Sequence, residues 1–159
     1  MVIELRTKLN NYIENEQFIG ILPYKDIRDN EILMRRYVGI GTLWRTNPTG
    51  VYNCHGLTFA SKRTRVFTNS TIRMILMEDG YKNININDVF PGDIILYVTQ
   101  YGDITHSGFV LLVNKINDFS FPVPMILSKW GNGSEVYHAY NNCPYYSSEI
   151  KIEFHRMDG

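Results

Sequence analysis

Cysteine is scarce in this sequence, because only Cys54 and Cys143 among its 159 residues carry a thiol. A chain of this length can bury a core without a disulfide framework, so we expect both thiols to be reduced. Pairing of the two cysteines as a redox couple is the alternative. If both are reduced, Cys54 is the functional candidate and Cys143 a structural residue.

Long apolar runs and an excess of charge of one sign are also lacking. The formal net charge is zero, so the composition does not indicate a nucleic-acid or membrane-surface partner. Residues 1–6 include charged side chains where a signal peptide needs an apolar core, and no apolar run reaches membrane-spanning length. We therefore expect neither nucleic acid nor membrane as partner, and a cytoplasmic address or delivery by a non-classical route.

The apolar periodicity predicts helices first and an antiparallel sheet afterwards. Residues 2–18 have the spacing of an amphipathic helix, and a second helix is expected to begin at Asp29 or Asn30. Two more helices are expected over residues 54–61 and 71–79, the latter closed by Gly80. Strands are expected over residues 92–98, 105–113, 125–129, 135–140 and 149–155, with a loop over 114–124. This order indicates an α+β fold in one domain, residues 1–159, with a helical N-terminal layer over 1–45 and a catalytic core over 46–159.

Cys54 lies where a loop gives way to an expected helix. A thiol at a helix N-terminus faces unpaired backbone N–H groups and the positive end of the helix dipole, and both favour the thiolate, which is the nucleophile. The alternative is a small buried hydrophobe. His55, the next residue, would point away from Cys54 on a helix, so we expect it to shape the site or to pack.

His106 lies near the start of an otherwise apolar strand, where a polar ring needs a partner. An imidazole that accepts a proton from Cys54 would complete the first two members of a thiol hydrolase site. Gly108 lies on the same face and leaves room for another group to approach. A hydrogen-bonded structural histidine is the alternative for His106.

The third member of the site is open between His138, which we favour, and Ser128. Glu135 lies close to an expected turn, and Lys129 has the wrong charge to stabilise an imidazolium. For the oxyanion we expect the Cys54 backbone N–H and a second donor from Tyr52 or Asn53.

Metal ligation is not expected, because no close paired spacing of histidines and cysteines occurs, and no cofactor is implied. A basic cluster, Lys62, Arg63 and Arg65, follows the Cys54 helix. We interpret it as a solvated helix end rather than a substrate-anion site.

Three segments together resemble the NlpC/P60 and CHAP superfamily of papain-like cysteine peptidases and amidases, in particular a bacterial branch of it. They are Asn53-Cys54-His55-Gly56, then Phe90-Pro91-Gly92-Asp93 with its apolar strand, and Ile104-Thr105-His106-Ser107-Gly108. The resemblance implies a cysteine-bearing helix packed on an antiparallel sheet, with Cys54 and His106 as catalytic residues. If the chain is similar to NlpC/P60 members, the resemblance implies His138 as the third residue. If it is similar to CHAP-like members, the resemblance implies Ser128.

The expected function is hydrolysis of an amide bond through an acyl-enzyme. The resemblance implies a peptide or peptidoglycan-fragment substrate, and a protein-directed peptidase, deamidase or acyl transferase with a protein partner is nearly as compatible. A catalytically inactive papain-like binding module is the alternative.

Overall fold

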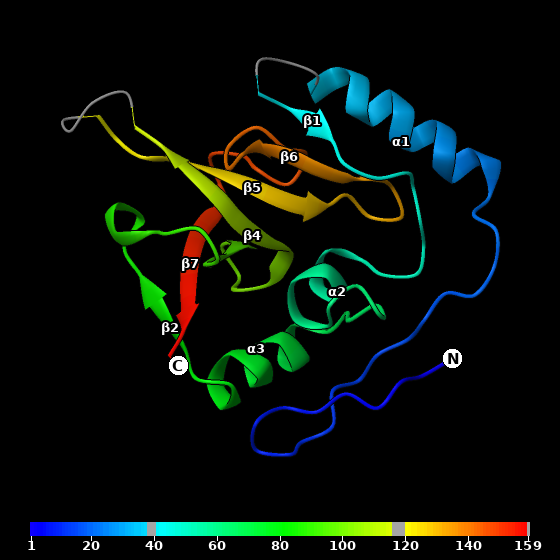
Figure 1. Ribbon diagram of the computed structural model, residues 1–159, viewed down its shortest axis with the longest axis horizontal. Coiled ribbons are helices and arrows are strands. Elements are labelled where there is room, and N and C mark those ends of the chain that lie inside the picture. The colour runs from blue at the N-terminus through cyan, green and yellow to red at the C-terminus, as the bar shows by residue number, and fades with distance from the viewer. Residues whose placement is uncertain (38–40, 116–119, 159) are drawn as a thin grey trace.

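The computed structural model describes residues 1–37, 41–115 and 120–158, and these form a mixed α+β structure around a seven-stranded antiparallel sheet (Figure 1). The strand order is β1-β6-β5-β4-β3-β7-β2, and β3 to β6 form a meander. The strands are β1 (Leu43–Trp44), β2 (Tyr81–Ile84), β3 (Ile94–Val98), β4 (Ile104–Asn114), β5 (Val123–Lys129), β6 (Glu135–Ala139) and β7 (Lys151–Met157). The helices are α1 (Tyr24–Tyr37), α2 (Cys54–Phe59) and α3 (Asn69–Glu78), with a 3₁₀ turn, η1 (Ile86–Asp88).

Both faces of the central sheet are covered, which explains why every residue of β3 is apolar and buried. On one face Ile94 and Leu96 join a core cluster with Ile72 of α3. On the other face Ile95 joins a second cluster with Met34 of α1. In Figure 1, α2 and α3 lie next to each other, whereas α1 lies beside β1 and β6.

The helix expected over residues 2–18 is wrong. This segment forms an extended strap with a turn at Asn10, whose φ is 71°, and an isolated bridge between Arg6 and Tyr12. Its buried residues recur at two-residue steps, as Leu5 with Thr7 and Ile13 with Asn15 do. That is the period of extended backbone, and hydrogen bonds of the strap to α3 outweigh its helix-like spacing.

The expected N-terminal layer over residues 1–45 is therefore helical only in α1, among the residues described. That helix begins at Tyr24, after Pro23, and not at Asp29 or Asn30. Asn30 instead lies inside it and binds the turn before β6, because its side chain accepts from the Ser134 backbone N–H at 3.3 Å.

The remaining expectations hold with shifted ends. Gly80 closes α3 with a φ of 77°, and the five expected strands correspond to β3 through β7. Two short strands, β1 and β2, were not predicted. Of the loop expected over 114–124, residues 116–119 lie outside the described residues, and β5 already begins at Val123. No helix among the described residues is long and apolar enough to cross a membrane.

Asp93, the acid of the Pro-Gly-Asp segment, ties the start of β3 to β7. Its carboxylate, in a residue only 4% exposed, accepts from Arg156 Nε at 2.7 Å and from Arg156 Nη2 at 2.8 Å. It also accepts from the backbone N–H of Phe90 at 2.6 Å. Asp93 thus has a structural role that fixes the entry to the meander.

We expect Asp93→Asn to lower the free energy of unfolding by about 2 kcal/mol, because it removes a charge-assisted pair from a mostly buried site. Urea denaturation measures this loss. The matched control is Asp103→Asn, at an exposed residue of the β3–β4 turn. Equal losses in the two variants would contradict the structural role of Asp93.

Candidate active site

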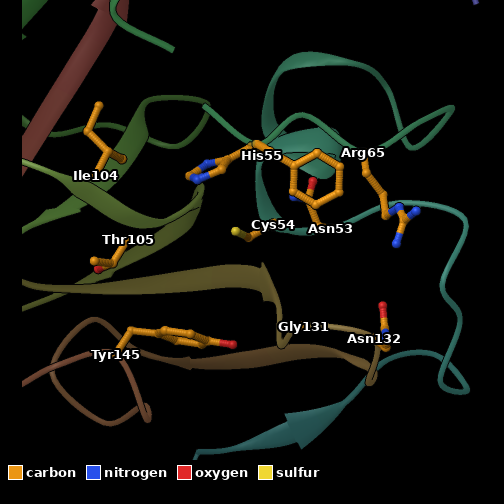
Figure 2. Close-up of a pocket in the computed structure, with 10 residues that line it drawn as sticks. Asn53, Cys54, His55, Arg65, Ile104, Thr105, Gly131, Asn132 and Tyr145 are labelled. Carbon is orange, nitrogen blue, oxygen red and sulfur yellow. The ribbon is translucent and has the colours of Figure 1, made fainter. Parts of the chain in front are cut away.

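Cys54 is the first residue of α2 and lines a pocket of about 400 Å³ (Figure 2). The preceding residue, Asn53, caps the helix, because its Oδ1 accepts from the Gly56 backbone N–H at 2.8 Å. Gly56 is required here, since an added Cβ would lie 1.9 Å from the carbonyl oxygen of Thr64. The pocket is lined by Asn53, Cys54, His55, Arg65, Phe67, Ile104, Thr105, Gly131, Asn132 and Tyr145.

Ser107 of β4 holds α2 on the sheet. Its Oγ lies 2.8 Å from His55 Nδ1 and 2.9 Å from Thr58 Oγ1, and all three residues are buried. Thr58 in turn donates to the carbonyl oxygen of Cys54 at 2.9 Å. His55 therefore packs against the sheet and also lines the pocket.

The Cys54 thiol is protonated in this conformation, which differs from the expected thiolate. Burial raises its pKa to about 11, although the backbone N–H groups of Ser107, His55 and Cys54 itself and the charge of Lys129 act to lower the pKa. The N–H groups at the helix N-terminus lower the pKa of the thiol, as predicted, but desolvation raises it by more.

His106 lies on the opposite face of β4 from Ser107, because successive strand residues alternate between faces. Its ring stacks on Tyr145 with centroids 3.6 Å apart and planes 7° from parallel. The residue is fully buried, and neither ring nitrogen has a hydrogen-bond partner in the described part of the chain. Burial, then the neighbouring His138 and His55, hold the pKa of His106 well below its ordinary value.

The structure therefore places no hydrogen bond between Cys54 and His106. The two residues are nevertheless linked through their neighbours. The backbone N–H of Ser107, the residue after His106, acts to lower the pKa of the Cys54 thiol. Tyr145 stacks on the imidazole of His106 and also lines the Cys54 pocket.

His138 and Ser128, the two candidates for the third residue, bind each other. Ser128 Oγ lies 2.7 Å from His138 Nε2 and accepts from Trp130 Nε1 at 3.1 Å. His138 Nδ1 lies 2.8 Å from the carbonyl oxygen of Ala139. Because a carbonyl only accepts, Nδ1 carries the proton and Nε2 accepts from the Ser128 hydroxyl. Gly108 permits this, since an added Cβ would lie 2.9 Å from Ser128 Cβ.

The side chains expected to complete the oxyanion site are engaged elsewhere. The Tyr52 hydroxyl donates to Glu135 in a short hydrogen bond, and the Asn53 amide donates to the Val66 carbonyl oxygen at 2.7 Å. The backbone N–H of Cys54, at the start of α2, is the remaining predicted donor. Glu135 also pairs with Lys62 at 2.8 Å, so it anchors the Cys54 loop.

Sequence reasoning missed Tyr145, and it considered Lys129 only to set it aside as the third residue. Lys129 is fully buried, and its Nζ donates to the carbonyl oxygens of Thr49 and Gly131, both at 2.7 Å. Burial lowers its pKa to about 8, against the opposing charges of Cys54 and Glu135. Lys129 could have been found from the sequence, because a lysine at the end of an apolar strand is unusual. Tyr145 lies in a loop, where no sequence pattern indicated a role.

No group of three or more histidine, cysteine, aspartate or glutamate side chains within residues 1–37, 41–115 and 120–158 could hold a metal ion. In comparisons with known proteins, no family model, curated sequence or solved structure matches the chain. We therefore infer function from the chemistry of the pocket.

We expect the protein to lose stability in acid, because two of its histidines are buried in the neutral form. Burial lowers the pKa of both His55 and His138 from 6.5 to about 4. Between these two values the unfolded chain binds more protons than the folded one, so the free energy of unfolding falls as the pH falls. We expect a loss of about 2 kcal/mol or more between pH 6.5 and pH 5, measured by urea denaturation.

The loss should persist in 0.5 M NaCl, because buried groups are screened much less than surface charges. A free energy of unfolding that does not change over this pH interval would show that these histidines are not desolvated.

Proposed function

We propose that the protein is a papain-like thiol hydrolase that cleaves an amide bond, with Cys54 as nucleophile and His106 as general base. The observation that carries this proposal is the buried His106 ring. Neither of its nitrogens has a hydrogen-bond partner among the described residues, and the ring stacks on Tyr145, which lines the same pocket as Cys54. An unpaired buried imidazole is costly to the fold, and functional sites are where such groups are retained.

In the proposed reaction His106 takes the proton of Cys54, and the thiolate attacks the carbonyl carbon of the substrate. The oxygen becomes an anion that accepts from the Cys54 backbone N–H. The imidazolium then donates its proton to the leaving amine as the C–N bond breaks. Water, deprotonated by His106, hydrolyses the resulting thioester and returns both residues to their neutral forms.

The dyad has to assemble before the first step, because thiol and imidazole are both neutral and not bonded in this conformation. Tyr145 is the contact that changes, since its ring covers the imidazole and borders the pocket. Hydrogen bonds between catalytic groups are often long or misaligned without substrate, and they tighten when substrate binds. Substrate entry that displaces Tyr145 would open the His106 ring to the pocket that Cys54 lines, because Tyr145 borders both.

His138 and Ser128 would act as one unit rather than as rivals for the third position. The protonated Nδ1 of His138 is fixed by Ala139, and Ser128 is fixed between His138 and Trp130. This fully hydrogen-bonded group is rigid. Ser128 Oγ keeps one acceptor lone pair through which it would orient His106, while the His138 ring holds Ser128 in place.

The substrate class rests on the resemblance to NlpC/P60 and CHAP domains. It favours a peptide, with a peptidoglycan stem peptide or a protein-directed peptidase, deamidase or acyl-transfer reaction as the candidates. A catalytically inactive binding module is the second function, and the raised pKa of Cys54 with the stacked His106 favours it.

Alkylation by iodoacetamide separates the two functions. In a Cys143→Ser, Tyr145→Ala background, where only Cys54 can react and the His106 ring is uncovered, the hydrolase predicts labelling at pH 7 that slows about tenfold or more when His106→Ala is added, because the base no longer supports the thiolate. The control is His155→Ala, on β7 and outside the pocket lining. Labelling that rises only above about pH 9 and ignores the His106 substitution would overturn the hydrolase in favour of the binding module.

A further inference from the structure

The lining of the Cys54 pocket carries one permanent charge. Among the described residues that line it, Arg65 is the only lysine or arginine, and no aspartate or glutamate is present. The net charge of the lining is therefore positive, although the chain as a whole is neutral. Arg65 pairs with Glu16, but that carboxylate is largely exposed and lies outside the lining, so the pocket still favours a ligand that carries one negative charge.

The Arg65 guanidinium is held in place rather than free in solvent. The backbone of Arg65 forms an isolated β-bridge with Glu16, with hydrogen bonds of 3.0 Å in both directions. The side chain lies between the rings of Phe18 and Phe67, with its Cζ 5.6 Å and 5.2 Å from the two centroids. A guanidinium fixed between two aromatic rings loses little side-chain entropy when it binds a ligand.

One edge of that guanidinium remains available. Nε donates to the Glu16 carbonyl oxygen at 3.3 Å, and Nη2 lies 3.3 Å from the largely exposed Glu16 carboxylate. Among the described residues no acceptor lies within hydrogen-bond distance of Nη1. Figure 2 shows the Arg65 guanidinium above the Asn132 side chain, with Cys54 to the left of both.

The rest of the basic cluster behaves differently. Lys62 pairs with Glu135, and the exposed Arg63 donates to the Ala60 carbonyl oxygen at 3.2 Å. The interpretation of the cluster as a solvated helix end is therefore wrong for Arg65, which the chain turns into the pocket. Arg63 serves as a matched control, because it has the same chemistry two residues away and does not line the pocket.

We infer that the substrate carries a carboxylate close to the scissile amide, and that Arg65 binds it through Nη1. On the other side lies the Asn132 amide, whose Nδ2 donates one N–H to Asp26 at 3.2 Å and keeps the second for the ligand. That the ligand is a substrate rests on the proposed hydrolase. Binding of an anion by Arg65 does not depend on that proposal. A carboxylate is matched in charge by a single guanidinium and accepts its N–H groups in one plane. Arg65 and Asn132 are thus specificity-determining residues, and an acidic peptide is the class of ligand.

Two alkylating probes of similar size test the subsite. Iodoacetate carries the carboxylate and iodoacetamide does not, and both react at Cys54 in the Cys143→Ser background. We expect the ratio of the iodoacetate rate to the iodoacetamide rate to fall about tenfold in Arg65→Gln, because a charge-assisted hydrogen bond is lost. It should not change in Arg63→Gln, and it should fall with added salt.

Two further variants keep the test valid if Arg65→Gln perturbs the fold. Arg65→Lys retains the charge and should keep part of the preference, whereas Glu16→Gln removes the competing carboxylate from outside the pocket and should raise the ratio. A ratio that is the same in the parent, Arg65→Gln and Glu16→Gln would overturn the inference while leaving the hydrolase intact.

Peptide binding tests the subsite without any reaction. In a Cys54→Ala variant, acetyl-Ala-Glu-amide should shift the NMR amide signals of Gly131 and Asn132, and acetyl-Ala-Gln-amide should not. The shifts should vanish with Arg65→Gln and remain with Arg63→Gln. Binding of both peptides alike, or binding that ignores Arg65, would overturn the inference. Selective binding by a protein whose Cys54 does not alkylate would instead overturn the hydrolase alone.

Discussion

The hydrogen bonds of Ser107 to His55 and Thr58 are the contact on which the site depends. They dock a six-residue helix on the middle of a buried sheet, where the helix is too short to be stable by itself. They also determine two further positions. The Cys54 thiol comes to lie near the β4 backbone, and His106, one residue before Ser107, is turned to the opposite face.

That geometry gives the site an unusual resting form. Burial keeps the thiol protonated and the imidazole neutral, so neither carries the charge of an assembled thiolate–imidazolium pair. The polar groups nearby are well paired, as the Ser128–His138–Trp130 group illustrates. The unpaired His106 is the exception, and Tyr145 is the side chain that separates it from the pocket. Activation in this account is a change of contacts at Tyr145 rather than a change of fold.

Local sequence signals predicted the parts of the structure that local chemistry determines. The helix start at Cys54, the glycine end of α3 and the β3–β4 hairpin follow from capping, left-handed backbone and strand periodicity. The failures came from tertiary contacts. The strap over residues 2–18 has helical spacing but binds α3 in extended form. The motifs that contain Cys54 and His106 could not show that Ser107, and not His106, faces α2. The role of Arg65 was likewise hidden, because a bridge to Glu16 turns it into the pocket.

The most direct test of the account is to incubate the protein with a library of end-blocked peptides and to follow the products by mass spectrometry. We expect the parent protein to cleave some of the peptides at an amide bond, and Cys54→Ser to abolish this cleavage without preventing peptide binding. Peptides that bind the parent protein and emerge intact would contradict the central claim, and would leave the pocket as a recognition site without chemistry.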